Sequence, residues 1–151
     1  MPDITDGAVA SASDFPPSVY AFDDTRISDI DSTSYITGSP VVFVYFTAPT
    51  SGKVLLTIGG GLQDSSTANR VHLAPVVRED GPGGSAVVSA NVVTRGIGCP
   101  EQTTSFMYLS RTSLITGLTP GRTYYAHTAH KVSGGSSGDI ASRDLTVVPV
   151  S

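Results

Sequence analysis

Only a few residues in this chain have the type and spacing that a catalytic site needs. Residues 134–138 read Gly-Gly-Ser-Ser-Gly and match the pattern G-x-S-x-G. In α/β hydrolases this pattern holds a serine nucleophile on a strand-to-helix turn, with an acid and a histidine further along the chain. Here it lies in a Gly/Ser tract between two predicted strands, and no histidine follows it. We therefore predict no catalytic residue and expect that the protein is not an enzyme.

The three histidines do not have the spacing of a metal site. His127 and His130 are three residues apart in a predicted strand, so their side chains point to opposite faces. His72 is remote from both, and there is neither an H-x-H nor an H-E-x-x-H motif. Residues 29–34, Asp-Ile-Asp-Ser-Thr-Ser, begin like a calcium loop but lack the glycine and the terminal glutamate of an EF-hand. We predict no cofactor and no metal ligand, and calcium binding by this segment stays open.

Charge is sparse and unevenly distributed along the 151 residues. Charged residues make up 15% of the chain, against about 25% in an average soluble domain, which suits a surface partly covered by partner proteins. Residues 1–31 carry seven acids and one base, whereas the other eight bases are scattered singly along the rest of the chain. Nucleic-acid binding needs a clustered basic face, so we predict no nucleic-acid partner. The longest apolar run, residues 41–46, is too short to span a membrane.

The elements that would position a site are β-strands. Short β-branched and aromatic runs alternate with clusters of Gly, Pro, Asp and Ser, and no stretch longer than a turn has helical periodicity. This pattern predicts an all-β, antiparallel β-sandwich with jelly-roll or Ig/fibronectin-like topology. Gly59–Gly61 is predicted to be a loop, and Pro75 to mark an edge strand or a bulge. The predicted strands are residues 41–47, 53–58, 70–78, 86–94, 103–110, 113–118, 122–132 and 141–150.

Residues 1–32 are predicted to form an acidic, extended N-terminal arm in front of a sandwich domain of residues 33–151. The arm mixes proline, aspartate and serine with short apolar groups and has no lasting period, so it cannot bury enough surface to fold alone. Its aromatic residues Phe15, Tyr20 and Phe22 indicate that it docks, either on a neighbouring chain or along its own domain.

The run of residues 41–46 is apolar on both faces of the predicted strand. Alternation places residues 41, 43 and 45 on one face and residues 42, 44 and 46 on the other. An antiparallel sandwich strand normally has one face in the core and one in water. We assign Val42, Val44 and Phe46 to the outer face and predict that another subunit covers them. The alternatives are that the arm or a second layer covers these side chains.

A local motif lies at residues 115–124, which read ITGLTPGRTY. It resembles the E-to-F corner of fibronectin type III domains, where a tyrosine hydroxyl bonds back to the backbone. In that resemblance Leu118 anchors the core, Pro120 and Gly121 turn the chain, and Tyr124 makes the corner. The Gly/Ser loop from residue 133 to 138 then takes the place of an F–G hairpin.

A broader resemblance covers residues 41–150. The pieces VVFVYFTAPTSGKVLLTIGG, LITGLTPGRTYYAHTAHKVSGG and RDLTVVPV resemble β-domains of minor structural proteins in bacteriophages of actinobacteria, some of them jelly-roll trimers. The resemblance implies a virion protein that is assembled in the bacterial cytoplasm. It would be a capsid decoration, minor capsid or head-fibre protein that binds the major capsid protein or another virion protein through its arm and self-associates, as a trimer, through the sandwich.

Two further hypotheses come from other classes. The protein could be a tail-fibre or receptor-binding module that recognises a glycan through an aromatic and polar cluster on loops, around Asp64, Asn69 or Tyr108. The absence of tryptophan argues against this reading. The third, a hydrolase, would require Ser136 as the nucleophile.

Overall fold

The computed structural model describes residues 14–134 and 138–151. Every regular element in these residues is a β-strand, which confirms the predicted all-β class. No helix in the described part of the chain could cross a membrane. The strands are β1 (Val19–Asp23), β2 (Ile27–Ile30), β3 (Ile36–Thr37), β4 (Phe43–Thr47), β5 (Lys53–Asp64), β6 (Val71–Glu79), β7 (Ala86–Val88), β8 (Ile97–Gly98), β9 (Met107–Ile115), β10 (Thr123–Val132) and β11 (Gly138–Val150).

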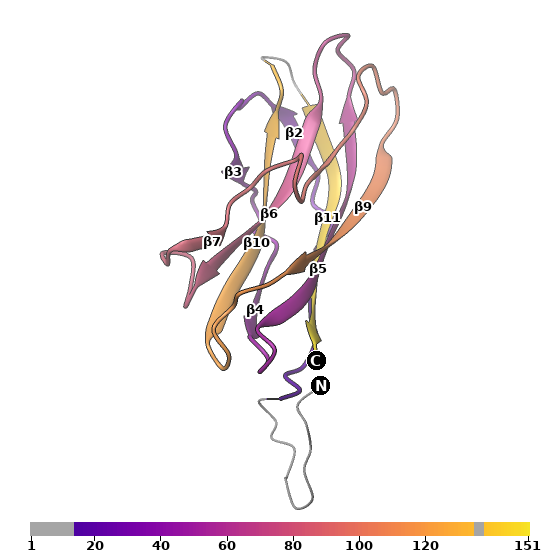
Figure 1. Ribbon diagram of the computed structural model, residues 1–151. Helices are drawn as coiled ribbons and strands as arrows, with labels where there is room; N and C mark the ends of the chain where they lie inside the picture. The colour runs from indigo at the N-terminus through magenta and orange to yellow at the C-terminus, as the bar shows by residue number, and fades with distance from the viewer. Residues whose placement is uncertain (1–13, 135–137) are drawn as a thin grey trace, which may run out of the picture.

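The strands form two antiparallel sheets that pack face to face (Figure 1). In the first sheet β1 and β2 both pair with β11, followed by β5 and β9; in the second, β3 and β4 both pair with β10, followed by β6, which pairs with β7 and β8. Strands that follow one another in the sequence therefore often lie in opposite sheets. This holds for β4 and β5, for β5 and β6, for β9 and β10, and for β10 and β11. This interleaved order is the jelly-roll arrangement of two Greek keys. It decides between the two predicted topologies, and it rules out an F–G-type hairpin between β10 and β11.

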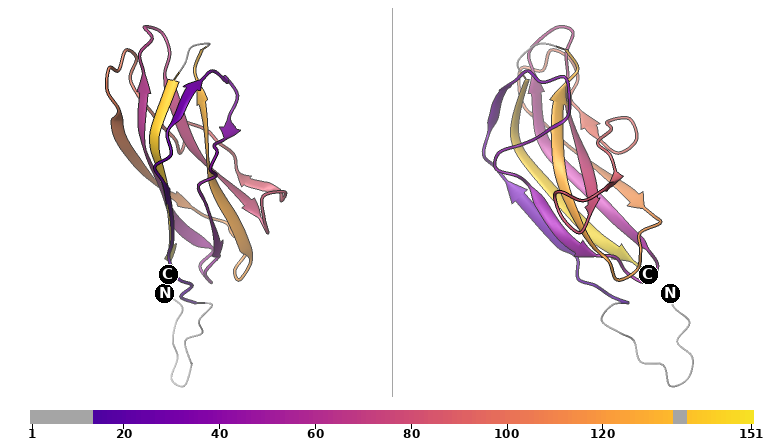
Figure 2. Two further views of the ribbon diagram at one scale, coloured as in Figure 1. Left: turned by 180° about the vertical axis from the view of Figure 1, so that it is seen from behind. Right: turned by 90° about the vertical axis from the view of Figure 1, so that its left-hand side faces the viewer.

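The core lies between the two sheets and is built from alternate residues of the long central strands. Val54, Leu56 and Ile58 of β5 share one face, as predicted, and all three side chains are fully buried. Strand β6 faces them with Leu73 and Val77, which are also fully buried. The second sheet faces the viewer in the right panel of Figure 2, and strands of the first sheet, such as the yellow β11, are visible behind and beside it.

The predicted loop at Gly59–Gly61 is wrong. Strand β5 continues through the three glycines to Asp64, and the glycines pair with β9 on one side and with β11 on the other. Pairing on both sides fixes the extended backbone that the glycines would not hold alone. Strand β9 is likewise one element and not the two predicted, whereas the predicted strand at 86–94 ends at Val88 and gives way to a turn.

Pro75 lies in β6 between its two short neighbours. Strand β8 pairs with His72 and Leu73, and β7 pairs from Val77 onwards, so β6 has no neighbour beside Pro75 on that side. On the other side Pro75 lies opposite Thr128, whose N–H donates to Val42 and not to β6. Proline therefore removes no hydrogen bond of the ladder here. The local gap between β7 and β8 explains why β6 tolerates a proline although it is not an edge strand.

The predicted boundary at residue 32 differs from the structure, because residues 19–30 are part of the first sheet. Strands β1 and β2 pair with β11 of the same chain. The buried Arg143 of β11 holds this edge: its Nη2 lies 3.0 Å from Asp23 Oδ1, and its Nη1 donates to the Pro40 carbonyl at 2.8 Å. This part of the predicted arm docks along its own domain. Residues 1–13 lie outside the described part of the chain.

Candidate functional site

The structure corrects the predicted assignment of the two faces of residues 41–46. The side chains of Val42, Val44 and Phe46 are buried in the core, and the Phe46 ring stacks on Tyr124 with centroids 5.6 Å apart. Period-two alternation separates the two faces but does not tell which one meets the opposite sheet. One signal in the sequence was available: Tyr45 carries a hydroxyl that favours a position in contact with water.

The outward half of this strand belongs to a cluster of rings. We define the aromatic patch as Val41, Phe43 and Tyr45 with Tyr125 and His127 of β10; in the register of β4 and β10, Tyr45 lies opposite Tyr125 and Phe43 opposite His127. The rings of Phe43, Tyr45 and Tyr125 contact one another with centroids 5.2 to 6.0 Å apart. Tyr125 also contacts His127 at 5.3 Å. The side chains of Val41, Phe43 and Tyr45 nevertheless stay 40%, 44% and 47% exposed.

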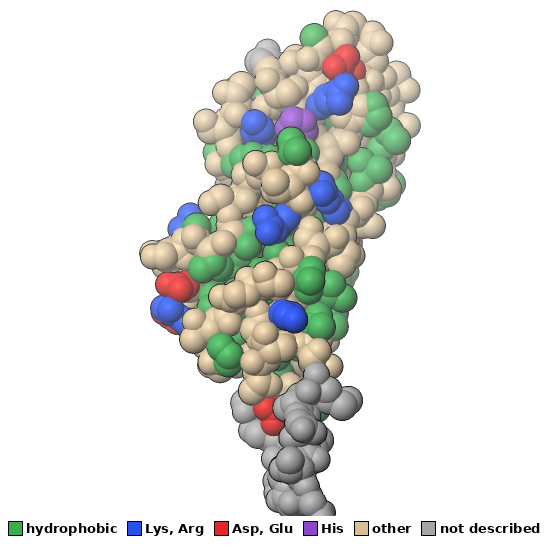
Figure 3. All heavy atoms as spheres, in the orientation of Figure 1, with side chains coloured by type: hydrophobic (Ala, Val, Ile, Leu, Met, Phe, Trp, Pro, Cys, Tyr) green, Lys and Arg blue, Asp and Glu red, His purple; other side chains and the backbone are tan. Residues whose placement is uncertain are grey.

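The aromatic patch carries no charge at neutral pH. Burial lowers the pKa of His127, and the positive charge of Arg78 lowers it further. Burial raises the pKa of Tyr125, and Tyr45 raises it further. Both groups are therefore neutral, and covering the patch requires no charged group of its own to be desolvated. On the face of the molecule in Figure 3 charged side chains are few, and they lie singly or next to one of opposite sign between larger areas of hydrophobic and neutral polar surface.

The aromatic patch borders an edge of the second sheet. Strand β4 pairs with β10 on one side only. Beside its free edge runs the segment that leads into β1, and a small open pocket of about 130 Å³ lies there. Its lining combines this segment with the strand of the patch: Pro17, Val19, Tyr45, Phe46, Thr47 and Thr123.

The aromatic residues of the predicted arm are exposed, but the structure does not bring them to the aromatic patch. Phe15, Tyr20 and Phe22 are 52%, 64% and 54% exposed. Tyr20 and Phe22 lie in β1, and they point away from the core because Val19 and Ala21 pack against it. Their side chains therefore stand on the outer face of the first sheet, opposite the patch. Their role as partner contacts stays a prediction.

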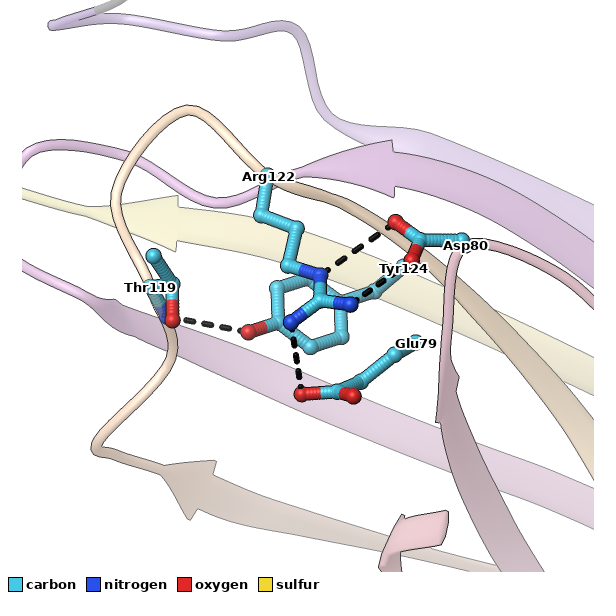
Figure 4. Close-up of polar contacts among 5 residues, drawn as sticks. All are labelled: Glu79, Asp80, Thr119, Arg122 and Tyr124. Carbon is cyan, nitrogen blue, oxygen red and sulfur yellow. Dashed lines mark hydrogen bonds and ion pairs between the residues drawn. The ribbon is translucent and has the colours of Figure 1, made fainter. Parts of the chain in front are cut away.

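The residues of the predicted corner form a compact turn between β9 and β10 (Figure 4). The Thr119 N–H donates to the Tyr124 hydroxyl at 2.9 Å, which is the bond that a tyrosine corner makes. Leu118 is buried, and Gly121 has a φ of 76°, the left-handed conformation that favours glycine. Arg122 next to the turn pairs with both Glu79 and Asp80, at 2.9 and 2.7 Å. The corner is structural and ties the two sheets together at this end.

The remaining predicted residues lie apart from one another. His127 stands on the outer face of the second sheet, while His130 is buried on the core side of the same strand. Asp64, proposed for a glycan-binding cluster on loops, is buried at the end of β5, and Tyr108 lies in β9 and not in a loop. Within the described residues no group of three or more His, Cys, Asp or Glu side chains could hold a metal ion. Ser136 lies outside the described residues.

No family model matches the sequence, and no curated protein matches it either. Solved structures do match its fold. A chain of infectious bursal disease virus, Gx strain, superposes with a TM-score of 0.54 at 18% identity over 99% of this chain and 37% of that chain. The VP2 subviral particle of the same virus gives a TM-score of 0.51 at 14% identity over 99% of this chain and 38% of that chain. This chain thus spans little more than a third of the length of those viral chains, and the likeness shows the fold alone, an antiparallel β-sandwich.

Proposed function

We propose that this protein is a non-enzymatic structural component of a bacteriophage virion, a capsid decoration or head-fibre protein that forms a homotrimer through the aromatic patch and binds the particle through its N-terminal segment. The observation that carries the proposal is the exposure of Phe43 and Tyr45 on a strand whose other face already fills the core. A solitary β-sandwich normally presents polar residues there.

The chemistry of the aromatic patch suits contact with another protein. Aromatic residues are enriched in the buried centres of protein interfaces, and charged residues are depleted there. Covering apolar surface contributes about 25 cal/mol per Å² before the costs of association. Because Phe43, Tyr45 and Tyr125 already contact one another, little side-chain freedom remains to be lost when a partner covers them.

The test is the mass of the full chain in solution, measured by sedimentation equilibrium at micromolar concentration. We expect an oligomer for the native sequence and a monomer for Tyr45→Lys, because the new charge would be buried without a partner. Val93→Lys is the matched control: Val93 is 79% exposed on a turn outside the patch, so this variant should keep the native mass.

Binding to particles is a separate measurement. The native chain should co-sediment with capsids assembled from the major capsid protein, and co-sedimentation with isolated tails instead would place it on the tail. A native chain that stays monomeric and binds neither particle refutes the proposal. Thermal unfolding of Tyr45→Lys must resemble that of the native chain, so that loss of the oligomer is not loss of the fold.

A further inference from the structure

The outer face of the first sheet has a surface of a different composition. The side chains of alternate residues point outward on four neighbouring strands, and the ladder registers place them in rows across the sheet. Phe22, Asp144, Gly59 and Ser110 form one row, and Tyr20, Thr146, Thr57 and Thr112 form the next. We define the first-sheet platform as these residues with Gly61 and Tyr108, which lie opposite each other in the adjoining row.

Two glycines form the floor of the first-sheet platform. A Cβ atom added to Gly59 would lie 2.5 Å from Asp144 Oδ2, and one added to Gly61 would lie 2.7 Å from Tyr108 Cε1. Neither glycine has a positive φ, so a left-handed backbone conformation is not the reason for glycine at these two positions. The glycines instead let a carboxylate and an aromatic ring lie against the backbone, which keeps both groups low on the sheet surface.

Exposed rings stand at the two borders of the first-sheet platform. Tyr20 and Phe22 lie on β1, and Tyr108, on β9, is 72% exposed. The order β1, β11, β5, β9 separates the outer two strands by three strand spacings, or about 14 Å. The Tyr108 ring leans over Gly61 of β5, so the rings lie closer together than the two strands do. They flank a surface that fits an extended ligand lying across the strands.

The surface between the rings is polar and carries a carboxylate without an ionic partner. Thr57 and Thr112 bond to each other through their hydroxyls at 2.7 Å, and Ser110 and Thr146 add two more hydroxyl groups. Within the described residues Asp144 makes no hydrogen bond or ion pair, and partial burial raises its pKa without a contribution from any neighbouring charge. The first-sheet platform contains no basic residue.

This combination matches a carbohydrate. Aromatic faces accept the apolar faces of sugar rings, while carboxylate and hydroxyl oxygens bond to sugar hydroxyls. The row next to the platform on the same face is apolar and exposed, and it consists of Val148, Leu55 and Leu114. A second copy of the chain nevertheless fits the platform itself less well than the aromatic patch, because the two central rows of the platform are polar. An anionic ligand is disfavoured by Asp144 and finds no cation in the platform to offset it. We propose that the first-sheet platform binds a neutral glycan between the Phe22 and Tyr108 rings, with Asp144 accepting hydrogen bonds from sugar hydroxyls.

This inference does not rest on the proposed role in assembly. Phe43 and Tyr45 lie on the outer face of the opposite sheet. The proposed assembly through the aromatic patch can therefore be refuted without refuting glycan binding by the first-sheet platform, and the reverse also holds. A glycan site would give a virion protein a second activity, adhesion to a polysaccharide surface.

The test is binding of the full-length native chain to an array of neutral and acidic oligosaccharides, followed by titration calorimetry with the neutral oligosaccharide that binds best. We expect binding to neutral members. Tyr108→Ala and Phe22→Ala should each weaken it about tenfold, the loss that corresponds to about 1.4 kcal/mol for a removed aromatic contact. Asp144→Asn should weaken it as well, because the amide accepts fewer hydrogen bonds than the carboxylate.

The control is Val93→Ala, an exposed apolar side chain on a turn outside both the aromatic patch and the first-sheet platform, which should keep the native affinity. Circular dichroism of each variant must match the native spectrum. Absence of binding to every neutral oligosaccharide overturns the proposal, as does tighter binding to acidic ones. Equal affinity of Tyr108→Ala, Phe22→Ala and the native chain also overturns it. If Tyr108→Ala instead changes the mass of the oligomer, the first-sheet platform is a subunit contact and not a glycan site.

Discussion

His130 makes the stability of the fold dependent on pH. Its side chain is 2% exposed on the core side of β10, and its Nδ1 has no hydrogen-bond partner within the described residues. Burial is the main cause that lowers its pKa from 6.5 to about 4, and the positive charge of Arg143 adds to it. Arg143 is itself paired with Asp23, so that carboxylate is already engaged and does not compensate a second positive charge.

The sign and the size of the effect follow from linkage. The folded-state pKa lies below the unfolded one, so the unfolded chain takes up the proton first as the pH falls through 6.5. The contribution of His130 is therefore complete above that pH and is lost towards pH 4. A pKa difference of this size corresponds to a total loss of about 3 kcal/mol in unfolding free energy at low pH. About 2 kcal/mol of this loss has occurred by pH 5. His72 and His127, whose pKa values are also lowered by burial, act in the same direction.

The measurement is urea unfolding at pH 7 and at pH 5, at one protein concentration, for the native chain and for His130→Gln. Glutamine is of similar size and does not titrate. We expect His130→Gln to be less stable than the native chain at pH 7 but to lose about 2 kcal/mol less on acidification. His72 and His127 remain in both chains, so their contributions cancel in the comparison. Equal losses on acidification in the two chains would refute the argument.

Two further predictions concern stability. Tyr124→Phe removes the hydroxyl that accepts the Thr119 N–H and should cost about 1 kcal/mol in urea unfolding. Tyr108→Phe, at an exposed tyrosine outside the aromatic patch, should cost almost nothing; equal costs would mean that the corner bond is not stabilising. Asp23→Ala leaves the fully buried Arg143 without its carboxylate and should lower the unfolding free energy by about 3 kcal/mol or more. Glu101→Ala, which breaks the exposed pair with Arg70, should cost under about 1 kcal/mol, and the reverse order would contradict the importance assigned to Arg143.

Local features of this chain were readable from its sequence because their causes are local. Alternation alone places Val54, Leu56 and Ile58 on one face of a strand. The turn at Pro120 and Gly121 and the return of the Tyr124 hydroxyl depend on residues within one short loop. The succession of strands and turns without helical periodicity was enough for the class of fold, an antiparallel sandwich.

Contacts between residues distant in the sequence were decided only by the tertiary structure. The inner face of the strand at residues 42–46 depends on which side meets the first sheet, and both sides are apolar, so alternation alone could not choose. Gly59–Gly61 is extended because β9 and β11 pair with it, although a glycine run by itself favours a loop. The same holds for the exposed surfaces: the aromatic patch and the first-sheet platform each join residues from several strands, and only the jelly-roll order makes those strands neighbours.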